Sequence, residues 1–484
     1  MKNNLTKQFC LFFALVLMIP LMASCKKEEQ NTPEDTTVKE ASGYENPVEV
    51  MDFQNKEFVF MGTLWHSYEP LNYTDIAPET TTGDFVVDAA YERCAYIEET
   101  YNCIVSLEDV AYKDLLTSLE QNAMAGDEAA DYVLLRGTHY VSAINGGFLA
   151  EMSSYDLDYS AEWWDSTAID ALTINGKNYG VIGDVTINHL MAVWMTCFNK
   201  TMIENYTNLE NPYDMVNNGT WTFENVIRIA REFSNDEFDG TAGMSRNDLW
   251  GINYTRDTVM GLLAASGIKI VEKNSNGVPE LVITKYQSEV QNIFEKLYDE
   301  SYAADTMNEL CLCENTDTEI FDEGRVLFLF TATHNSTALR NSEVDYGIVP
   351  YPKASPEADY ISTTAGNFLT ILGIPVSNQN YKTASVFLEA FAAYGNKEVR
   401  PEFYENVLLR RVGGRDEESY EMLKYIFENI QYDIGTIYDI AETDIRDTAR
   451  TLNTNFASLV GDMRVTWKAD LQTLLDNFKP TEGN

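Results

Sequence analysis

The sequence predicts an α/β fold in which short strands and amphipathic helices alternate over two or more lobes. Short apolar runs typical of strands are followed repeatedly by segments whose apolar residues recur about every 3.6 positions, the period of an α-helix. The chain has 484 residues. A single domain usually has roughly 100–200 residues, so that this length predicts more than one lobe. Its 45% apolar and 12% aromatic residues supply a large core, which argues against global disorder.

The segment from residue 57 to residue 135 predicts the start of a doubly wound sheet. Residues 57–62, 103–107 and 132–135 are short apolar runs typical of strands. Between them, residues 84–101 and 115–123 have helical periodicity. A β-α-β-α-β order of this kind predicts parallel strands that are joined by right-handed crossovers.

The rest of the chain continues this alternation. A helix that reaches Phe233 begins at Thr220 or Thr222, because either hydroxyl can cap its first turn. Further helices are expected over residues 281–304, over residues 381–394 and through most of the chain from residue 401. Further strands are expected at residues 179–182, 192–198, 325–330, 346–350 and 368–375.

Residues 1–25 have the three parts of an export signal. Lys2 and Lys7 form a basic start, residues 9–22 are almost entirely apolar, and small residues lead into Cys25. The run Leu-Met-Ala-Ser-Cys that ends there resembles the lipobox of bacterial lipoproteins. The resemblance implies that residues 1–24 are removed as a signal peptide and that Cys25 becomes a diacylated N-terminus carrying palmitate or a similar chain. Ordinary secretion, with Cys25 incidental, is the alternative. Residues 25–47 are polar and charged, which predicts a flexible tether.

The net charge argues against one class of partner. The chain has 34 Lys and Arg against 76 Asp and Glu, so that its formal charge is −42. A phosphate backbone requires a basic face, and we therefore expect no binding to nucleic acid. The same acidity argues against adsorption to anionic lipid.

The spacing of cysteine and histidine predicts no metal site and no cofactor. The chain has no Cys-x-x-Cys and no pair of histidines at zinc spacing. The loop 235–240 resembles a calcium loop only faintly, because it lacks alternating ligands and a terminal Glu. Cys94 and Cys103 could form a disulfide in an exported protein. The interpretation we favour is that both are small buried hydrophobic residues.

The sequence contains none of the common catalytic motifs. There is no G-x-S-x-G, no H-E-x-x-H, no P-loop and no G-x-G-x-x-G, and no spacing singles out a pair of catalytic carboxylates. The four histidines are far apart in sequence, and for His189 we favour a hydrogen-bonded structural role. We therefore expect a protein that is not an enzyme.

Several segments, in a fixed order, resemble the family 1 extracellular solute-binding proteins of ABC transporters. Each motif is weak alone, but together they cover about residues 95–395, and the lipobox agrees with them because binding proteins of Gram-positive bacteria are commonly tethered in this way. The segments are residues 98–105, 125–133, 145–152, 175–182, 198–200, 218–224, 321–328, 345–352, 366–377 and 382–388.

The resemblance implies a periplasmic-binding-protein-like fold, in which two lobes, each a sheet flanked by helices, close about a hinge over a ligand. The N-terminal lobe would comprise residues 48–152 plus about 350–395, and the C-terminal lobe about 153–349 plus 396–484. The implied function is capture of a small solute, with an oligosaccharide expected, for the permease subunits of an ABC importer. The protein would be a monomer, lipid-anchored on the extracytoplasmic face of the bacterial cell membrane. A secreted enzyme acting on polysaccharide and a surface sensor or adhesin are the alternatives.

The resemblance also implies which loops contact the ligand, at the carboxyl ends of strands and between the lobes. Trp65 could stack on a sugar or lie in the core. Arg136 indicates an acidic ligand or an internal salt bridge, whereas Trp194 and Trp250 are expected in the core. Tyr404, Arg410, Arg411 and Asp416 could form a wall specific to a subgroup. The expected ligand-binding residues are Trp65, His66, Arg136, Thr138, His139, Asp184, His334, Asn335, Thr364 and Asn367.

Overall fold

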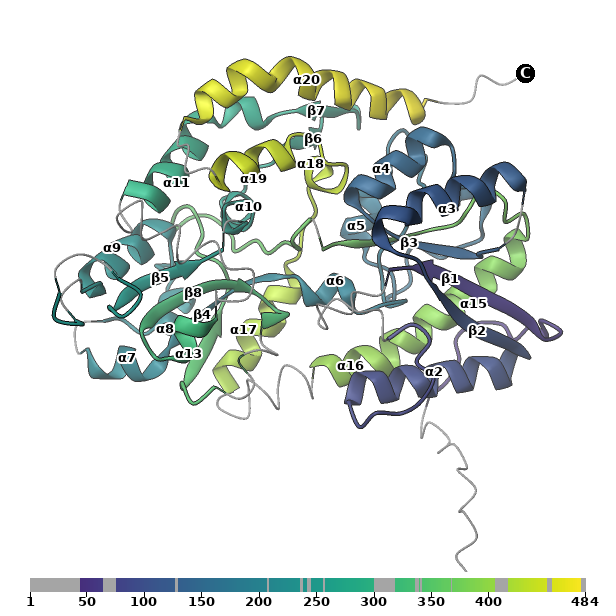
Figure 1. The fold of residues 1–484 in the computed structure, drawn as a ribbon, viewed down its shortest axis with the longest axis horizontal. Helices are drawn as coiled ribbons and strands as arrows, with labels where there is room; N and C mark the ends of the chain where they lie inside the picture. Colours follow the sequence, from purple (N-terminus) through teal and green to yellow (C-terminus); the bar gives the residue numbers. More distant parts are fainter. Residues whose placement is uncertain are drawn as a thin grey trace, which may run out of the picture. The chain divides into compact units, whose positions relative to one another are not determined.

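The computed structural model describes most of the chain from residue 44 to residue 479 (Figure 1). The predicted signal peptide, Cys25 and most of the predicted tether lie outside the described residues. Among the described residues, no helix has both the length and the apolar character that crossing a membrane requires. Within the described span, the omitted segments are residues 64–74, 127–128, 207–208, 236–237, 242–244, 256, 300–317, 336–338, 340–341, 367, 405–416 and 451–454.

A first four-stranded sheet has the order β10-β3-β1-β2. β1 (Lys56–Gly62) pairs in parallel with β2 (Cys103–Asp109) and with β3 (Tyr132–Arg136). Helices α2 (Phe85–Tyr101) and α3 (Tyr112–Ala125) connect these strands, so that the predicted β-α-β-α-β unit is confirmed. The fourth strand, β10 (Thr370–Gly373), joins from far along the chain and runs antiparallel to β3.

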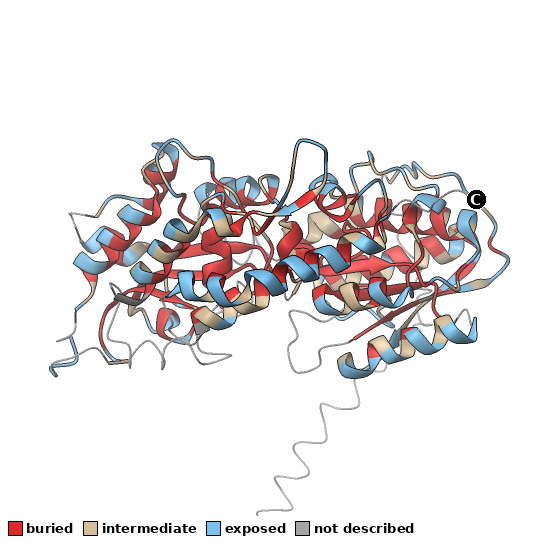
Figure 2. Cartoon of the chain, turned by 90° about the horizontal axis from the view of Figure 1, so that it is seen from above, coloured by how far each residue is buried: buried red, intermediate tan, exposed pale blue. Residues whose placement is uncertain are grey.

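The side chains of this sheet alternate between two apolar cores, as the pleat of a strand requires. In β3, Tyr132 belongs to one core and its neighbour Val133 to the other. α2 (Phe85–Tyr101) and α15 (Tyr381–Tyr394) cover the first of these cores, where the Phe387 ring of α15 stacks on Phe58 of β1 with centroids 3.9 Å apart. The strands are buried and the helices expose their outer faces (Figure 2).

A second four-stranded sheet has the order β5-β8-β4-β9. β4 (Trp194–Asn199) runs antiparallel to β8 (Val326–Ala332) and β9 (Tyr346–Val349), and β5 (Trp250–Tyr254) runs parallel to β8. Every residue of these four strands is buried, as near-continuous apolar runs predict for a sheet covered on both faces. The predictions of β4, β8 and β9 are confirmed.

Helices from distant parts of the sequence cover the second sheet. α9 (Phe223–Phe233) packs on β5, and Thr222, not Thr220, caps it by accepting a hydrogen bond from the Asn225 amide. α17 (Glu417–Glu428) packs on β9. The predicted helical character of the chain after residue 401 is therefore confirmed over this segment, where a late helix completes an early sheet.

The predicted strand at residues 179–182 is wrong. Only Val181 pairs, through an isolated antiparallel bridge with Leu372 of β10. Gly180 lies so close to the sheet that a Cβ atom there would come within 2.6 Å of Ile371. The chain then turns away through α6 (Asn188–Met191) toward the second sheet. The apolar run at 179–182 is buried by packing and not by a strand ladder, and an apolar pattern does not distinguish these two cases.

Three stretches carry the chain between the sheets, and we call them the crossing segments. The first, residues 182–193, leads to β4, and the second, residues 350–369, leads from β9 to β10. These two meet where Val193 pairs with Thr364. The third begins after α15 with a π-helical turn (Gly395–Val399) and continues into α16 (Arg400–Glu402).

The C-terminal helices complete the architecture. α20 (Phe456–Asn477) contacts α4 (Gly137–Gly146) and α11 (Gln287–Asp299) (Figure 1). α4 follows β3 of the first sheet. α11 packs against α10, and both of these helices precede β8 of the second sheet in the sequence. Asn477 donates a hydrogen bond of 2.6 Å to Asn145 of α4. α20 therefore spans elements of both sheets.

Cys94 and Cys103 are buried and are not joined in a disulfide, which confirms the interpretation we favoured for them. The Cys94 thiol donates a hydrogen bond of 3.1 Å to the Ile76 carbonyl. Burial raises the pKa of Cys94 to about 11 and that of Cys103 to about 12. Both side chains are therefore neutral thiols in the core of the first sheet.

We expect replacement of Arg93 by Met to lower the free energy of unfolding by about 2–4 kcal/mol, because buried backbone carbonyls that lose their donor cost about 1–3 kcal/mol each. Arg93 of α2 is fully buried, donates to the Val185 carbonyl at 3.0 Å and offsets the charge of buried Asp75. Urea unfolding measures the change. Arg228→Met is the matched control, because Arg228 is 54% exposed and should change stability by less than about 0.5 kcal/mol. Equal stability of the two variants would contradict the argument.

Candidate functional site

Four of the expected residues fall in segments that the structure does not describe. Trp65 and His66 lie in the omitted segment 64–74, and Asn367 and Cys25 are omitted as well. Arg410, Arg411 and Asp416, expected in a wall after residue 400, are also outside the described residues. Their roles stay predictions.

The direct junction of β3 and α4 places three expected residues at the carboxyl end of the first sheet. Arg136 ends the strand and immediately precedes α4, and Thr138 and His139 lie in the first turn of the helix. Thr138 is exposed, and its hydroxyl lies 3.3 Å from the Tyr112 hydroxyl. The His139 ring stacks on Tyr112 with centroids 4.0 Å apart. An imidazole and a phenol therefore form one aromatic surface beside an exposed hydroxyl.

Phe368 brings together expected residues from the two sheets. The Arg136 guanidinium lies over its ring, with Cζ 5.6 Å from the centroid. The His334 ring, which follows β8 of the second sheet, meets the same phenyl ring edge-on at 5.7 Å. A guanidinium over an aromatic face is a favourable cation–π geometry. Asn335, by contrast, donates its amide to the Thr331 hydroxyl at 2.7 Å. Phe368 itself was not predicted, although it follows the expected Asn367 directly.

Both histidines of this region are neutral at physiological pH. Burial lowers the pKa of His334 to about 4, opposed by a hydrogen bond with the Met191 backbone. Burial and the charge of Arg136 lower the pKa of His139. The positive charge at this place therefore belongs to Arg136.

A small pocket lies next to this group, and we call it the Trp194 pocket. It encloses about 40 Å³, which is room for one or a few small polar groups. Thr364 and its neighbours Thr363 and Gly366 line it, as the sequence predicts for a ligand-contacting loop. Its other walls come from α10 (Thr258–Ala265), from residues 267–270, and from residues 431–436 near α18 (Ile434–Ile437).

Trp194 is the ligand-site candidate that sequence reasoning missed. It is buried as predicted, at 5% exposure, but it stands at the first position of β4 and lines the pocket. Among the described residues, none accepts a hydrogen bond from its indole Nε1. Buried indole N–H groups normally have an acceptor, so that this donor suits a ligand oxygen. The signal that could have identified Trp194 as a candidate is its position at the end of a strand and not in its middle.

The segment after residue 430 supplies the far wall of the pocket. The Tyr432 hydroxyl donates to Asp165 at 3.0 Å. Asp433 accepts backbone hydrogen bonds from Ile270 and Gly435, and burial raises its pKa to about 6. These carboxylates are engaged inside the protein. The hydroxyls of Tyr432 and Thr363 donate inside the protein as well, so that toward a ligand they can serve as acceptors.

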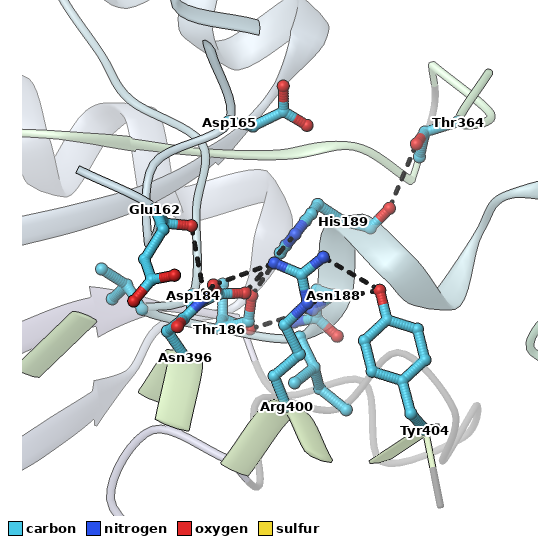
Figure 3. A network of polar contacts seen from close by, with 12 residues as sticks. Glu162, Asp165, Asp184, Thr186, Asn188, His189, Thr364, Asn396, Arg400 and Tyr404 are labelled. Carbon is cyan, nitrogen blue, oxygen red and sulfur yellow. Dashed lines mark hydrogen bonds and ion pairs between the residues drawn. The ribbon is translucent and has the colours of Figure 1, made fainter. Parts of the chain in front are cut away.

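Asp184 does not lie in this pocket but at the junction of the crossing segments (Figure 3). Its side chain is 1% exposed, and Oδ2 accepts hydrogen bonds from Asn396 at 2.8 Å and from Arg400 at 3.2 Å. Arg400 also donates to the Tyr404 hydroxyl at 3.0 Å. Asp184 thus ties the first crossing segment to the third. Its predicted ligand contact stays a prediction, and the structure places it where the first and third crossing segments meet.

His189 has the hydrogen-bonded structural role that the sequence favoured. Its Nδ1 lies 2.9 Å from the Thr186 carbonyl, and its own carbonyl accepts from the Thr364 hydroxyl at 3.1 Å. The first crossing segment is therefore bonded to the second within this network (Figure 3).

Comparison with known proteins identifies this architecture. Residues 92–400 match the family model described as bacterial extracellular solute-binding protein, well over half of the chain. No curated protein matches the chain.

Two solved structures are similar in fold. The ABC substrate-binding protein Lmo0181 from Listeria monocytogenes, in complex with cycloalternan, is 15% identical with a TM-score of 0.54, covering 88% of this chain and 99% of that chain. A cyclo/maltodextrin-binding protein complexed with maltotetraose is 15% identical with a TM-score of 0.51, covering 89% and 99%.

Replacement of His334 by Gln should flatten the dependence of stability on acid pH. The folded pKa of His334 is about 4 against 6.5 for the free side chain, so that between these values only the unfolded chain binds this proton. Stability is fully present above pH 6.5 and is lost as the pH falls toward 4, by roughly 3 kcal/mol for this group. Thermal unfolding at pH 4.5 and 7.5 measures the difference. Parallel pH profiles of the two proteins would contradict the assignment.

Proposed function

Because the chain belongs to the bacterial extracellular solute-binding proteins, we propose that it captures an oligosaccharide and delivers it to the permease of an ABC importer. Members of this family bind solutes and are not enzymes. The alternative of a secreted enzyme, kept open by the sequence, is set aside for that reason. The proposal covers three properties of the chain: the class of its ligand, the hinge motion that would enclose the ligand, and the attachment to the membrane.

The observation that carries the ligand class is the Trp194 pocket. Sugars have apolar C–H faces and polar rims, and they need aromatic surfaces together with hydrogen-bonding groups. The pocket combines the buried Trp194 N–H donor with Thr363 and Tyr432. Its small volume suits a single hydroxyl or hydroxymethyl group that an oligosaccharide inserts. The rest of the ligand would lie against Phe368 and the stacked His139 and Tyr112.

The ligands of the two similar structures support the same class. One was solved with cycloalternan and the other with maltotetraose, and both ligands are oligosaccharides. The fold alone does not transfer a ligand at this level of identity. The pocket chemistry of this chain is therefore the primary support.

Hinge closure is the mechanism that the crossing segments favour. Arg136 comes from the first sheet and His334 from the second, and both side chains contact Phe368 of the second crossing segment. A ligand that contacts both sides would stabilise their approach, because binding shifts an equilibrium toward the state with more contacts. No step of this function forms or breaks a covalent bond.

Replacement of Trp194 by Phe should weaken oligosaccharide binding about five- to tenfold, since it removes one hydrogen bond worth about 1–1.5 kcal/mol and keeps an aromatic ring. Isothermal titration with linear and cyclic glucans, including maltotetraose and cycloalternan, measures the affinity. Trp250→Phe is the control, because Trp250 donates to the Ser245 carbonyl in the core and does not line the pocket. Unchanged affinity of Trp194→Phe would exclude the pocket. Failure of every oligosaccharide to bind the wild type would overturn the ligand class and leave the family intact.

We expect Cys25→Ser to release the protein from the membrane. The resemblance of this run to a lipobox implies a diacylated cysteine at the N-terminus, and two acyl chains anchor a protein stably where one does not. Phase partitioning in a cloud-point detergent measures the anchor: the wild type should enter the detergent phase and the variant the aqueous phase. A wild type found only in the aqueous phase would instead support ordinary secretion.

A further inference from the structure

A second cavity lies at the junction of the crossing segments, and we call it the Asp184 cavity. It encloses about 210 Å³ and shares no lining residue with the Trp194 pocket. Its walls are formed by residues 163–167 and by Gly183, Asp184, His189, Leu190, Arg400, Phe427, Glu428 and Ile430. A cavity of about 150 Å³ in another protein holds benzene, so that this one can hold a small organic molecule.

Two hydrogen-bond acceptors face each other in this cavity. Oδ1 of Asp184 is buried, and among the described residues none donates a hydrogen bond to it. It lies 3.9 Å from Nε2 of His189. The Thr186 carbonyl can only accept, so that the proton of neutral His189 sits on Nδ1 and leaves Nε2 as an acceptor. A carboxylate oxygen and an imidazole lone pair at this distance require a donor between them.

The charges of the cavity favour a cationic donor. Asp165, Asp184 and Glu428 line it against the single guanidinium of Arg400. That guanidinium is already engaged by Asp184 and Tyr404. The remaining field is negative, and a buried carboxylate is stabilised most by a charged N–H donor.

The aromatic wall suits the same ligand. Trp163 and Trp164 line the cavity, and the indole N–H groups of both donate to Glu389, away from it. Both indole N–H groups are therefore already engaged and do not compete for a ligand acceptor. Cations bind favourably to the faces of indole rings.

We propose that the Asp184 cavity is a second binding site, for a small organic cation with N–H donors such as an alkylguanidinium or alkylammonium ion. One N–H group donates to Oδ1 of Asp184 and another to Nε2 of His189. The indole rings cover the apolar part of the ligand, and Glu428, which is exposed, adds long-range attraction. The site is separate from the oligosaccharide site and does not depend on it.

Titration of the full mature chain with methylguanidinium tests the proposal, with N-methylurea as the neutral analogue of nearly the same shape. The indole N–H signals of Trp163 and Trp164 in NMR spectra report on the cavity, and Trp163→Phe assigns them. We expect saturable shifts of these signals with methylguanidinium at physiological salt. N-methylurea should bind about tenfold more weakly or not at all.

Variants separate the cavity from the acidic surface. Asp184→Asn should weaken methylguanidinium binding about tenfold or more, because it removes the charge that faces the donor. Glu428→Gln, an exposed change that leaves the fold intact, should weaken it about two- to threefold. Glu421→Gln on the same helix lies outside the cavity and should have no effect. Absence of saturable shifts, equal binding of N-methylurea, or binding unchanged in both Asp184→Asn and Glu428→Gln would overturn the proposal.

Discussion

The burial of one carboxylate organises the junction between the two sheets. Asp184 is buried in the protein interior. An isolated charge is very unfavourable there, and the carboxylate therefore requires charged or hydrogen-bonding partners. Asn396 and Arg400 supply them from a chain segment more than 200 residues later. The requirement extends to the backbone, because a Cβ atom at position 395 would lie 1.9 Å from the Asp184 carbonyl. Only glycine permits this approach, so that the third crossing segment is fixed against the first.

The same region shows how backbone groups are satisfied where strands end. The chain leaves the first sheet after the single bridge at Val181, so that the following carbonyls have no strand partner. The buried guanidinium of Arg93 donates to those of Asp184 and Val185. Asp75 accepts the Ile187 amide at 2.7 Å. Side chains of α2 and of the turn before it thus replace a strand ladder, and they hold the crossing in a defined path without the pairing of a sheet.

The pattern of apolar residues predicted those strands and helices that depend mainly on residues close together in the sequence. Apolar runs located β1, β4 and β8 because each is a buried strand, and helical periodicity located α2 and α15 with nearly correct ends. The resemblance to solute-binding proteins, and with it the fold class, is confirmed by the family match over residues 92–400. The pattern failed at residues 179–182, which are buried without forming a strand ladder. It also failed where one side chain serves two roles. Trp194 is both core and pocket wall, and Phe368 matters because Arg136 and His334 reach it from opposite sheets. Such convergence depends on tertiary distance, which spacing in sequence does not encode.

The two cavities are separated by a single hydrogen-bonded layer. Thr364 lines the Trp194 pocket, and its hydroxyl donates to the carbonyl of His189, whose ring lines the Asp184 cavity. Tyr432 and Asp165 form a second link of the same kind. Coupling between sites needs an element that both ligands bias, and here that element is the pair of crossing segments themselves. A ligand on either side acts on the same backbone, so that any shift of the crossings toward a closed arrangement would be felt in both cavities without a long pathway between them. The buried Asp184 network therefore lies where the first and third crossing segments meet, and one hydrogen bond from Thr364 to His189 connects it to the Trp194 pocket.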